Sequence, residues 1–186
     1  MIPFWHIQDR YDPGVRTRIV ELGDAAALCQ IYNVEVAEPS VTFDLVARTL
    51  EDQRRWIDRH TGAHLALVAV EDDANVGEPG ARGESIVGFA SLSAFRDRPA
   101  YSTSVEDSVY VHRSARGRGV GRQLLAELVD AARDAGFHAV IGRIVGQNET
   151  SIRLHESCGF DLVGIEREVG RKHGRWLDVV EMQRLL

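Results

Sequence analysis

The sequence has little of what marks secreted, membrane-spanning or disulfide-bonded proteins. It holds two cysteines in 186 residues. Both Cys29 and Cys158 fall in helical patterns, which favours buried or half-buried free thiols, although a disulfide between them stays possible. No apolar run approaches the length of a membrane span, and residues 1–15 lack the apolar core of a signal peptide. These absences predict a cytoplasmic protein with no membrane partner.

An excess of basic charge is also missing. The net charge is −6 and the isoelectric point is about 5.6, which argues against nucleic acid or an anionic membrane surface as the main partner. With 44% hydrophobic and 27% charged residues, the chain suits one domain with a substantial core. His60 and His64 are four residues apart, but Gly62 interrupts the helix that would align them, so no metal site is expected.

The most informative stretch is Arg116 to Arg122, which reads Arg-Gly-Arg-Gly-Val-Gly-Arg. It follows a strand-like run, residues 105–111, and leads into a helical run, residues 123–135. A strand that turns through glycines into a helix leaves backbone N–H groups unpaired, and the helix dipole adds partial positive charge there. Three arginines add formal charge, so this turn predicts a site for a phosphorylated ligand.

The spacing within this turn excludes two common phosphate loops. A nucleoside-triphosphate loop needs Lys-Ser or Lys-Thr after its last glycine, but Gly121 is followed by Arg122. A dinucleotide loop needs a further glycine where Leu124 stands. What fits is Arg-x-x-Gly-x-Gly, from Arg116 to Gly121. The plainer alternative is a surface turn that only caps a helix, and the strand before it and the amphipathic helix after it argue against this.

The rest of the chain predicts alternating strands and helices. Gly136 should end the helix after the arginine loop in a Schellman motif, and residues 170–174 should join two final strands as a hairpin. This order indicates a mixed sheet with helices on both faces, in one domain of residues 16–186 that follows an N-terminal extension, residues 1–15. The expected strands are 15–20, 65–70, 86–95, 104–112, 140–145, 160–169 and 176–185; the expected helices are 24–36, 45–59, 121–135 and 148–157.

The Arg116–Gly121 loop resembles the pyrophosphate loop of GNAT-type N-acetyltransferases, which bind acetyl-coenzyme A. Further stretches are similar to the phosphinothricin N-acetyltransferase branch of that family, which acetylates the amino group of phosphinothricin or of methionine sulfone and sulfoximine. The chain departs from this branch in its N-terminal extension and in a long connection, residues 72–83. The matching stretches are Ile31–Asn33, Phe95–Tyr101, Val105–Glu106 with Ser108–Val111, Asn148 with Ser151–Glu156, and Gly170–Val179.

This resemblance implies an α/β (α+β) GNAT fold with a mixed, mostly antiparallel sheet of about seven strands and helices on both faces. It implies acetyl-coenzyme A as cosubstrate, no metal, direct attack of an amine on the thioester, and a homodimer. The implied acceptor is a small amino-acid analogue. Another amine (an amino acid, a polyamine or a protein N-terminus) is one alternative, and a module that binds acetyl-coenzyme A without turnover is another.

Glu106 is the candidate for the base that deprotonates the amine. Strand alternation puts it on one face with Ser108 and Tyr110, where a carboxylate can face a cleft. Strict alternation would bury Asp107 among valines, and a local bulge would resolve this. The alternative is that Glu106 is an ordinary solvent-facing strand residue.

His155 is the second catalytic candidate, because the resemblance places it where many GNAT enzymes carry the acid that protonates the coenzyme's sulfur. The alternative is a helix-face histidine hydrogen-bonded to a neighbour. Asn148 has two compatible roles, as a helix N-cap and as a partner of the pantetheine arm. The resemblance also implies oxyanion support from a backbone N–H near Tyr110. The complete implied coenzyme set is Val109, Tyr110, Val111, Arg116, Gly117, Arg118, Gly119, Val120, Gly121, Arg122, Asn148 and Ser151.

Two arginines and a phenol, Arg96, Arg98 and Tyr101, precede the Glu106 strand. They would suit an acceptor that carries a carboxylate and a second oxyanion, such as a phosphinate or sulfone. A solvated surface loop is the alternative. Lys172 is expected in an exposed turn, and Trp176 in the core or at a dimer contact.

Overall fold

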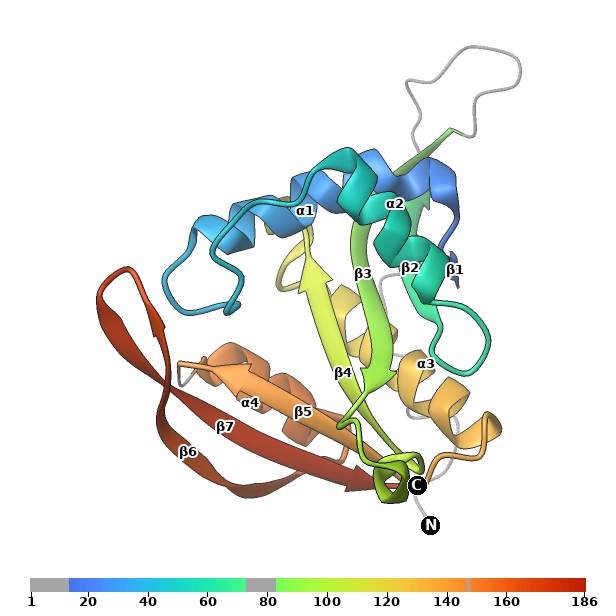
Figure 1. Cartoon of the computed structure of the whole chain (residues 1–186). Helices are drawn as coiled ribbons and strands as arrows, with labels where there is room; N and C mark the ends of the chain where they lie inside the picture. The colour runs from blue at the N-terminus through green and yellow to red at the C-terminus, as the bar shows by residue number, and fades with distance from the viewer. Residues whose placement is uncertain (1–13, 73–82, 147) are drawn as a thin grey trace.

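The structure is a computed structural model that describes residues 14–72, 83–146 and 148–186. One seven-stranded sheet runs through it in the order β1-β2-β3-β4-β5-β7-β6 (Figure 1). All neighbouring strands are antiparallel except β4 and β5, which are parallel. This is the mixed, mostly antiparallel sheet that was expected. The strands are β1 Val15–Ile19, β2 Ala66–Asp72, β3 Glu84–Ala94, β4 Ser104–Val111, β5 Ala139–Val145, β6 Asp161–Lys172 and β7 Arg175–Leu185.

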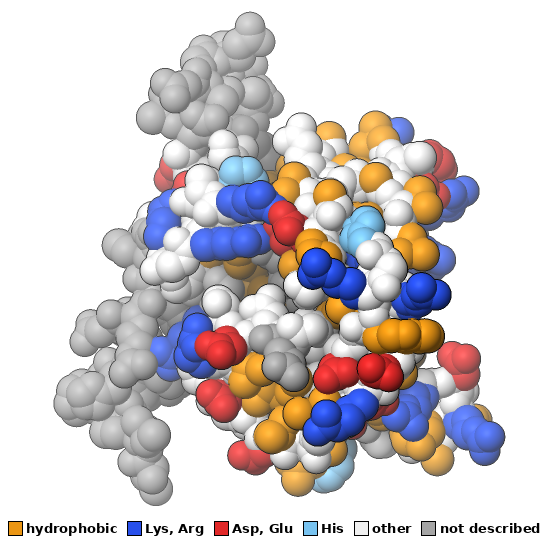
Figure 2. Space-filling view, turned by 90° about the vertical axis from the view of Figure 1, so that its left-hand side faces the viewer, with side chains coloured by type: hydrophobic (Ala, Val, Ile, Leu, Met, Phe, Trp, Pro, Cys, Tyr) orange, Lys and Arg blue, Asp and Glu red, His pale blue; other side chains and the backbone are white. Residues whose placement is uncertain are grey.

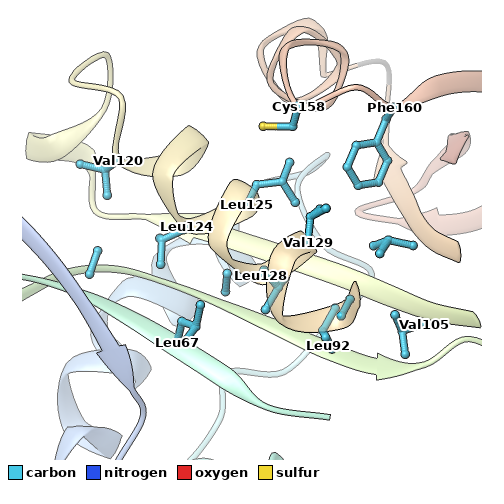
Figure 3. Close-up of a cluster of buried hydrophobic side chains, with 14 of the residues drawn as sticks. Leu67, Leu92, Val105, Val120, Leu124, Leu125, Leu128, Val129, Cys158 and Phe160 are labelled. Carbon is cyan, nitrogen blue, oxygen red and sulfur yellow. The ribbon is translucent and has the colours of Figure 1, made fainter. Parts of the chain in front are cut away.

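Helices cover both faces of the sheet. One face carries α1 and α2, and the other carries α3 and α4. Each face has its own hydrophobic core. Leu28, Ile31 and Phe89 are buried on the α1 side, whereas Leu124, Leu125 and Leu128 of α3 are buried on the other (Figure 3). The helices are α1 Ala25–Ala37, α2 Leu50–Arg59, α3 Val120–Asp134 and α4 Glu149–Ser157, with 3-10 turns η3 Leu22–Asp24, η4 Pro99–Tyr101 and η5 Arg113–Ala115.

Helix α3 ends as expected. Gly136 has φ +84°, its N–H donates to the carbonyl of Arg133, and the N–H of Phe137 donates to the carbonyl of Ala132. These two bonds are the Schellman pair, which only a residue that tolerates left-handed backbone can form at low cost. The prediction for Gly136 is therefore confirmed.

The second helix begins five residues later than expected, so the prediction for residues 45–49 was wrong. Thr49 is the N-cap of α2: its hydroxyl accepts from the N–H of Asp52, and the Asp52 carboxylate accepts from the N–H of Thr49. Such a capping box favours a helix start at this point. The segment before it, residues 38–49, joins α1 to α2 as a loop and is called the crossing loop below.

The final hairpin is longer and tighter than expected. Only His173 and Gly174 form the turn, both with left-handed φ (47° and 78°). Lys172 was expected in an exposed turn, and this prediction was wrong. Its side chain is only 1% exposed, and its ammonium donates to the carbonyl of Thr42 at 2.8 Å. Trp176 is not in the core, because it is 59% exposed with the guanidinium of Arg171 5.4 Å from its ring.

Both cysteines are free thiols, as expected. In the described residues no helix is long and apolar enough to cross a membrane. Acidic and basic side chains are interspersed on the face shown in Figure 2, in keeping with a chain that has no overall basic excess. Residues 1–13 of the expected extension and residues 73–82 of the expected long connection lie outside the described residues.

Candidate active site

The sheet opens between its two parallel strands. β4 and β5 pair only from Ser104 with Ala139 to Asp107 with Gly142. Beyond that point β4 stays with β3 and β5 stays with β7, so the two strands diverge. A cleft of about 580 Å³ fills the gap on the α3–α4 side. Its lining includes Val109, Tyr110 and Val111 of β4, three of the residues that the resemblance implied for coenzyme binding.

The arginine loop forms one end of this cleft. Gly117 and Gly119 have φ of 78° and 87°, a region that residues with a β-carbon rarely adopt. Gly119 is also the N-cap of α3 and supplies no capping side chain, and Gln123 makes the first intrahelical bond, to the Gly119 carbonyl. The N–H groups of the first turn therefore stay available for an anion, and the helix dipole favours one there.

The three arginines of the loop have different surroundings. Arg116 lines the cleft and is held by two bonds, to the carboxylate of Glu35 at 2.7 Å and to the carbonyl of Val111 at 3.1 Å. Arg118 forms an ion pair with Glu71 and does not line the cleft. Arg122 lines the cleft, and its guanidinium has no hydrogen-bond or ion-pair partner among the described residues. Arg116 and Arg122 are thus the two arginines of the loop that border the cleft, and the Glu35 carboxylate balances the charge of Arg116.

Glu35 is a residue of this candidate site that sequence reasoning missed. It is 3% exposed and lies on α1, 81 residues before Arg116 in the chain. A buried glutamate in a helix that is otherwise apolar on that face is the signal that could have found it, since buried carboxylates need a cationic partner.

Helix α4 borders the cleft on the other side. The Asn148 side chain accepts from the N–H of Ser151 at 3.2 Å, so the N-cap prediction is confirmed. Both residues line the cleft. One turn later, His155 is 4% exposed and its Nε2 lies 3.1 Å from Oδ2 of Asp107. Asp107 is therefore buried, as strict alternation along β4 requires. The β3–β4 register shows no shift, so the bulge expected at this residue is absent.

Glu106 faces the opposite side of the sheet, as alternation predicted. It lines a second cavity of about 270 Å³ together with Ser91 and Ser93 of β3. Burial raises the pKa of the Glu106 carboxyl above its ordinary value, and the charge of Arg143 opposes this rise. A carboxylate with a raised pKa is a stronger base, which is what proton removal from an ammonium requires.

The two cavities meet in the gap of the sheet. Ser108, Tyr110 and Arg143 line both of them. The smaller cavity has an aromatic wall, in which Tyr110 lies 5.0 Å from the ring of Tyr32 and 5.1 Å from that of Phe89. Molecules bound in the cleft and in the smaller cavity, which is called the acceptor cavity below, can therefore meet at this gap.

The loop between α1 and α2, residues 38–49, borders the acceptor cavity. Thr42, Asp44 and Arg48 of this loop line the cavity. The Tyr32 hydroxyl donates to Asp44 at 2.6 Å and contacts Thr42 at 3.1 Å, while the Arg48 guanidinium stacks 3.8 Å from the Tyr32 ring. The buried ammonium of Lys172 secures the loop from the far side.

The expected acceptor residues Arg96, Arg98 and Tyr101 do not join this group. Both arginines are exposed and Tyr101 is half-buried. The Arg96 guanidinium lies over the rings of Phe95 (4.7 Å) and Tyr101 (5.4 Å). None of the three lines either cavity in this chain.

These features fit acetyl-coenzyme A. The glycine turn and the first turn of α3 suit its pyrophosphate, and the open edge of β4 suits an extended, amide-bearing arm, because strand edges pair with such groups. No cluster of three or more His, Cys, Asp or Glu side chains in the described residues could hold a metal ion. A mixed sheet split at its parallel pair, with an anion loop at the split, defines the class of acyl-coenzyme A-dependent acetyltransferases.

The comparisons agree with this class. A sequence profile described as "Acetyltransferase (GNAT) domain" matches residues 17–180. The chain is 41% identical over 165 residues to a phosphinothricin N-acetyltransferase of Streptomyces coelicolor (88% of this chain, 91% of that one). It is 36% identical to an L-methionine sulfoximine/L-methionine sulfone acetyltransferase of Salmonella typhimurium (89% and 91%).

A solved structure is similar over nearly the whole chain. It is a GNAT superfamily phosphinothricin acetyltransferase from Sinorhizobium meliloti in complex with acetyl-coenzyme A, with a TM-score of 0.83, 35% identity, and coverage of 93% of this chain and 89% of that one. This chain belongs to the GNAT acetyltransferase family. It is an N-acetyltransferase, and its cosubstrate is acetyl-coenzyme A.

Proposed function

We propose that this enzyme acetylates the amino group of a small amino-acid analogue of the phosphinothricin, methionine sulfone or methionine sulfoximine type. The observation that carries the proposal is the position of Glu106, which lies in the acceptor cavity and two residues before Ser108, a residue that borders both this cavity and the coenzyme cleft. Relatives named for these acceptors, 41% and 36% identical over most of their length, support the same class.

The acceptor cavity suits a small charged molecule. Its volume of about 270 Å³ is at the lower end of small-molecule sites. It contains both signs of charge: Asp44 and Glu106 can bind an ammonium, whereas Arg48 and Arg143 can bind a carboxylate or a second oxyanion. This combination favours an amino acid over a polyamine, which carries only positive charge.

In the proposed mechanism Glu106 takes the proton from the acceptor's ammonium, and the free amine attacks the thioester carbonyl directly, with no covalent enzyme intermediate and no metal. The N–H groups of β4 beyond Asp107 that point toward β5 have no strand partner there, so one near Tyr110 can donate to the developing oxyanion. Arg116 and Arg122 would hold the pyrophosphate, with Asn148 and Ser151 near the pantetheine arm.

The test is thiol release from acetyl-coenzyme A with a panel of amines: phosphinothricin, methionine sulfone, methionine sulfoximine, common amino acids, polyamines and a short peptide. We expect saturable turnover with the first three. Turnover with other amines alone would retain the acetyltransferase and discard the proposed acceptor. Tight acetyl-coenzyme A binding without any turnover would favour the non-catalytic alternative.

We also propose that the protein is a homodimer. The edge strand β6 exposes Leu162, Val163 and Ile165 (62%, 54% and 45%), and Trp176 of β7 is exposed as well. An apolar edge of this kind favours pairing with a second copy. Since Arg96, Arg98 and Tyr101 lie outside both cavities of their own chain, their proposed contact with the acceptor requires a neighbouring copy.

Sedimentation equilibrium tests the dimer, with Leu162→Glu as the disrupting variant and Leu185→Glu on β7 as a second exposed leucine for comparison. A monomeric wild type would contradict the proposed dimer, and it would also contradict the proposed acceptor contacts of Arg96, Arg98 and Tyr101. The cytoplasm is the proposed location, because the two thiols are free and disulfides are rare there.

A further inference from the structure

Asp107 and His155 meet at the point where the sheet divides. Asp107 and Gly142 are the last residues of β4 and β5 that pair. The ring of His155 occupies the space above Gly142: a β-carbon there would lie 2.6 Å from Cδ2 and 2.8 Å from Nε2 of the imidazole. Any other residue at position 142 would therefore displace the ring. Glycine at position 142 leaves the space that the His155 ring occupies, and the buried Asp107 carboxylate fixes the ring there by a hydrogen bond.

Both ring nitrogens of His155 face hydrogen-bond acceptors. Nδ1 lies 2.8 Å from the carbonyl oxygen of Ser151, which can only accept, so Nδ1 carries a hydrogen. Nε2 lies 3.1 Å from Oδ2 of Asp107. A second proton must lie between these two atoms, because two acceptors without a proton would repel each other. With an ionised carboxylate, this makes the imidazole a cation.

We propose that Asp107 is a positioning residue for acetyl transfer, which holds His155 doubly protonated at the coenzyme cleft so that the imidazolium supplies the proton that the departing sulfur takes up. This inference rests on the proposed function, acetyl transfer from acetyl-coenzyme A to an amine, and on the acid role that the family resemblance predicts for His155. Asp107 and His155 both line the coenzyme cleft, beside the gap through which the acceptor reaches it.

The electrostatics of the pair agree with this assignment. Burial lowers the pKa of His155, but the hydrogen bond and the charge of Asp107 outweigh burial and raise that pKa above its ordinary value. The other charged groups of the same cleft are Arg122 of α3 and Arg143 of β5, and the thiol of Cys158, the C-cap of α4, follows His155 in the chain. Since the pKa is raised, His155 stays protonated to a higher pH than a free imidazole and loses its proton only above that value.

The proposed step balances. The C–N bond forms and the C–S bond breaks, and its electron pair goes to sulfur. The Nε2 proton of His155 leaves its hydrogen bond to Asp107 and passes to that sulfur. An ammonium acceptor loses two protons in becoming an amide, and both pass to solvent through Glu106. His155 regains one proton from solvent, so one proton is released in each turnover.

The test uses Asp107→Asn, which keeps the shape and a hydrogen bond but removes the charge. The asparagine amide donates to Nε2, so His155 becomes the neutral tautomer with hydrogen on Nδ1. The readout that needs no acceptor is the ¹⁵N spectrum of the histidine rings against pH, with His155→Gln assigning the signal among seven histidines. We expect the titration of His155 to move down by about 1 to 3 pH units in Asp107→Asn.

The kinetic readout is the pH profile of kcat. We expect kcat to fall about 100-fold, at the low end for a lost acid because a thiolate is a good leaving group, and the alkaline limb to move to lower pH. The affinity for acetyl-coenzyme A, measured separately, should stay the same. Asp24→Asn is the matched control, since Asp24 is a buried carboxylate paired with Arg18 outside the two cavities.

A wild-type His155 that is neutral at pH 7 overturns the proposal, as does an Asp107→Asn enzyme with an unchanged kcat profile. If the variant does not fold, the wild-type spectrum decides alone. The profile is recorded with whichever amine of the panel reacts, so failure of the sulfone and phosphinate acceptors does not affect this test.

Discussion

The two halves of the active site are built in different ways. The coenzyme cleft depends on backbone: two glycines with left-handed φ, the uncapped first turn of α3 and the open edge of β4. The acceptor cavity depends on side chains that come from distant segments, among them Tyr32 of α1, Arg48 of the crossing loop and Glu106 of β4. A backbone site of contiguous residues binds one shared chemical group, whereas a side-chain site can change its specificity one residue at a time.

The largest effect should come from Glu106→Gln, which alters the acceptor side alone. We expect kcat to fall roughly 10²- to 10⁴-fold, as is typical for loss of a general base, while the affinity for acetyl-coenzyme A is unchanged. Because the pKa of Glu106 is raised, wild-type activity should be lost as pH falls through a value above that of an ordinary carboxyl group. Thiol-release kinetics and calorimetry measure the two quantities.

Glu156→Gln, an exposed glutamate on α4, is the control and should leave both quantities unchanged. If Glu106→Gln retains the wild-type rate, another group is the base. The acceptor cavity then does not supply the reacting side chain.

Gly119→Val tests the backbone half. A β-branched residue at φ +87° introduces strain of about 1–3 kcal/mol and moves the N–H groups of the first turn of α3. Acetyl-coenzyme A should bind roughly 5- to 150-fold more weakly, with no change in the preference among acceptors. Gly23→Ala, where nothing lies within 4 Å of the added carbon and φ is not left-handed, is the control. A variant that binds normally but changes its acceptor preference would contradict the assignment.

Arg122→Gln sharpens the comparison within the loop. The Arg122 guanidinium has no partner in the described part of the chain, so its removal should weaken acetyl-coenzyme A binding about 10-fold and leave the melting temperature unchanged. Arg118→Gln, whose guanidinium pairs with Glu71 away from the cleft, should have the smaller effect on binding. The reverse order would place the pyrophosphate on the other side of the loop.

The smallest effect should come from Lys172→Met. This lysine is the only one in the chain, and it secures the loop over the acceptor cavity by one hydrogen bond to Thr42. Loss of that bond, about 1 kcal/mol, should raise the acceptor KM about 5-fold without changing acetyl-coenzyme A affinity.

Reaction with an amine-selective reagent provides a second check on Lys172. In the folded wild type the buried ammonium should react far more slowly than after denaturation. Fast labelling of the native protein would show that the loop is not held by this contact.

The coenzyme half was largely predictable because its signals are local. Arg116–Gly121 has the required spacing, Gly136 and Asn148 end and begin their helices as expected, and the face of Glu106 follows from strand alternation. Alternation also placed Asp107 in the interior, but a bulge was expected there because no partner for a buried carboxylate was visible in the sequence. That partner, His155, lies 48 residues away.

By itself the sequence determined the order of elements, the anion loop and the face of β4 on which Glu106 lies, since helix caps, glycine φ angles and the two-residue period of a strand act over a few neighbouring residues. Only the tertiary structure decided that Glu35 holds Arg116, that Lys172 is buried against Thr42, and that Asp107, Gly142 and His155 meet where the sheet divides. These contacts join residues that are far apart in the chain, and a buried charge takes its partner from whatever the folded chain brings beside it.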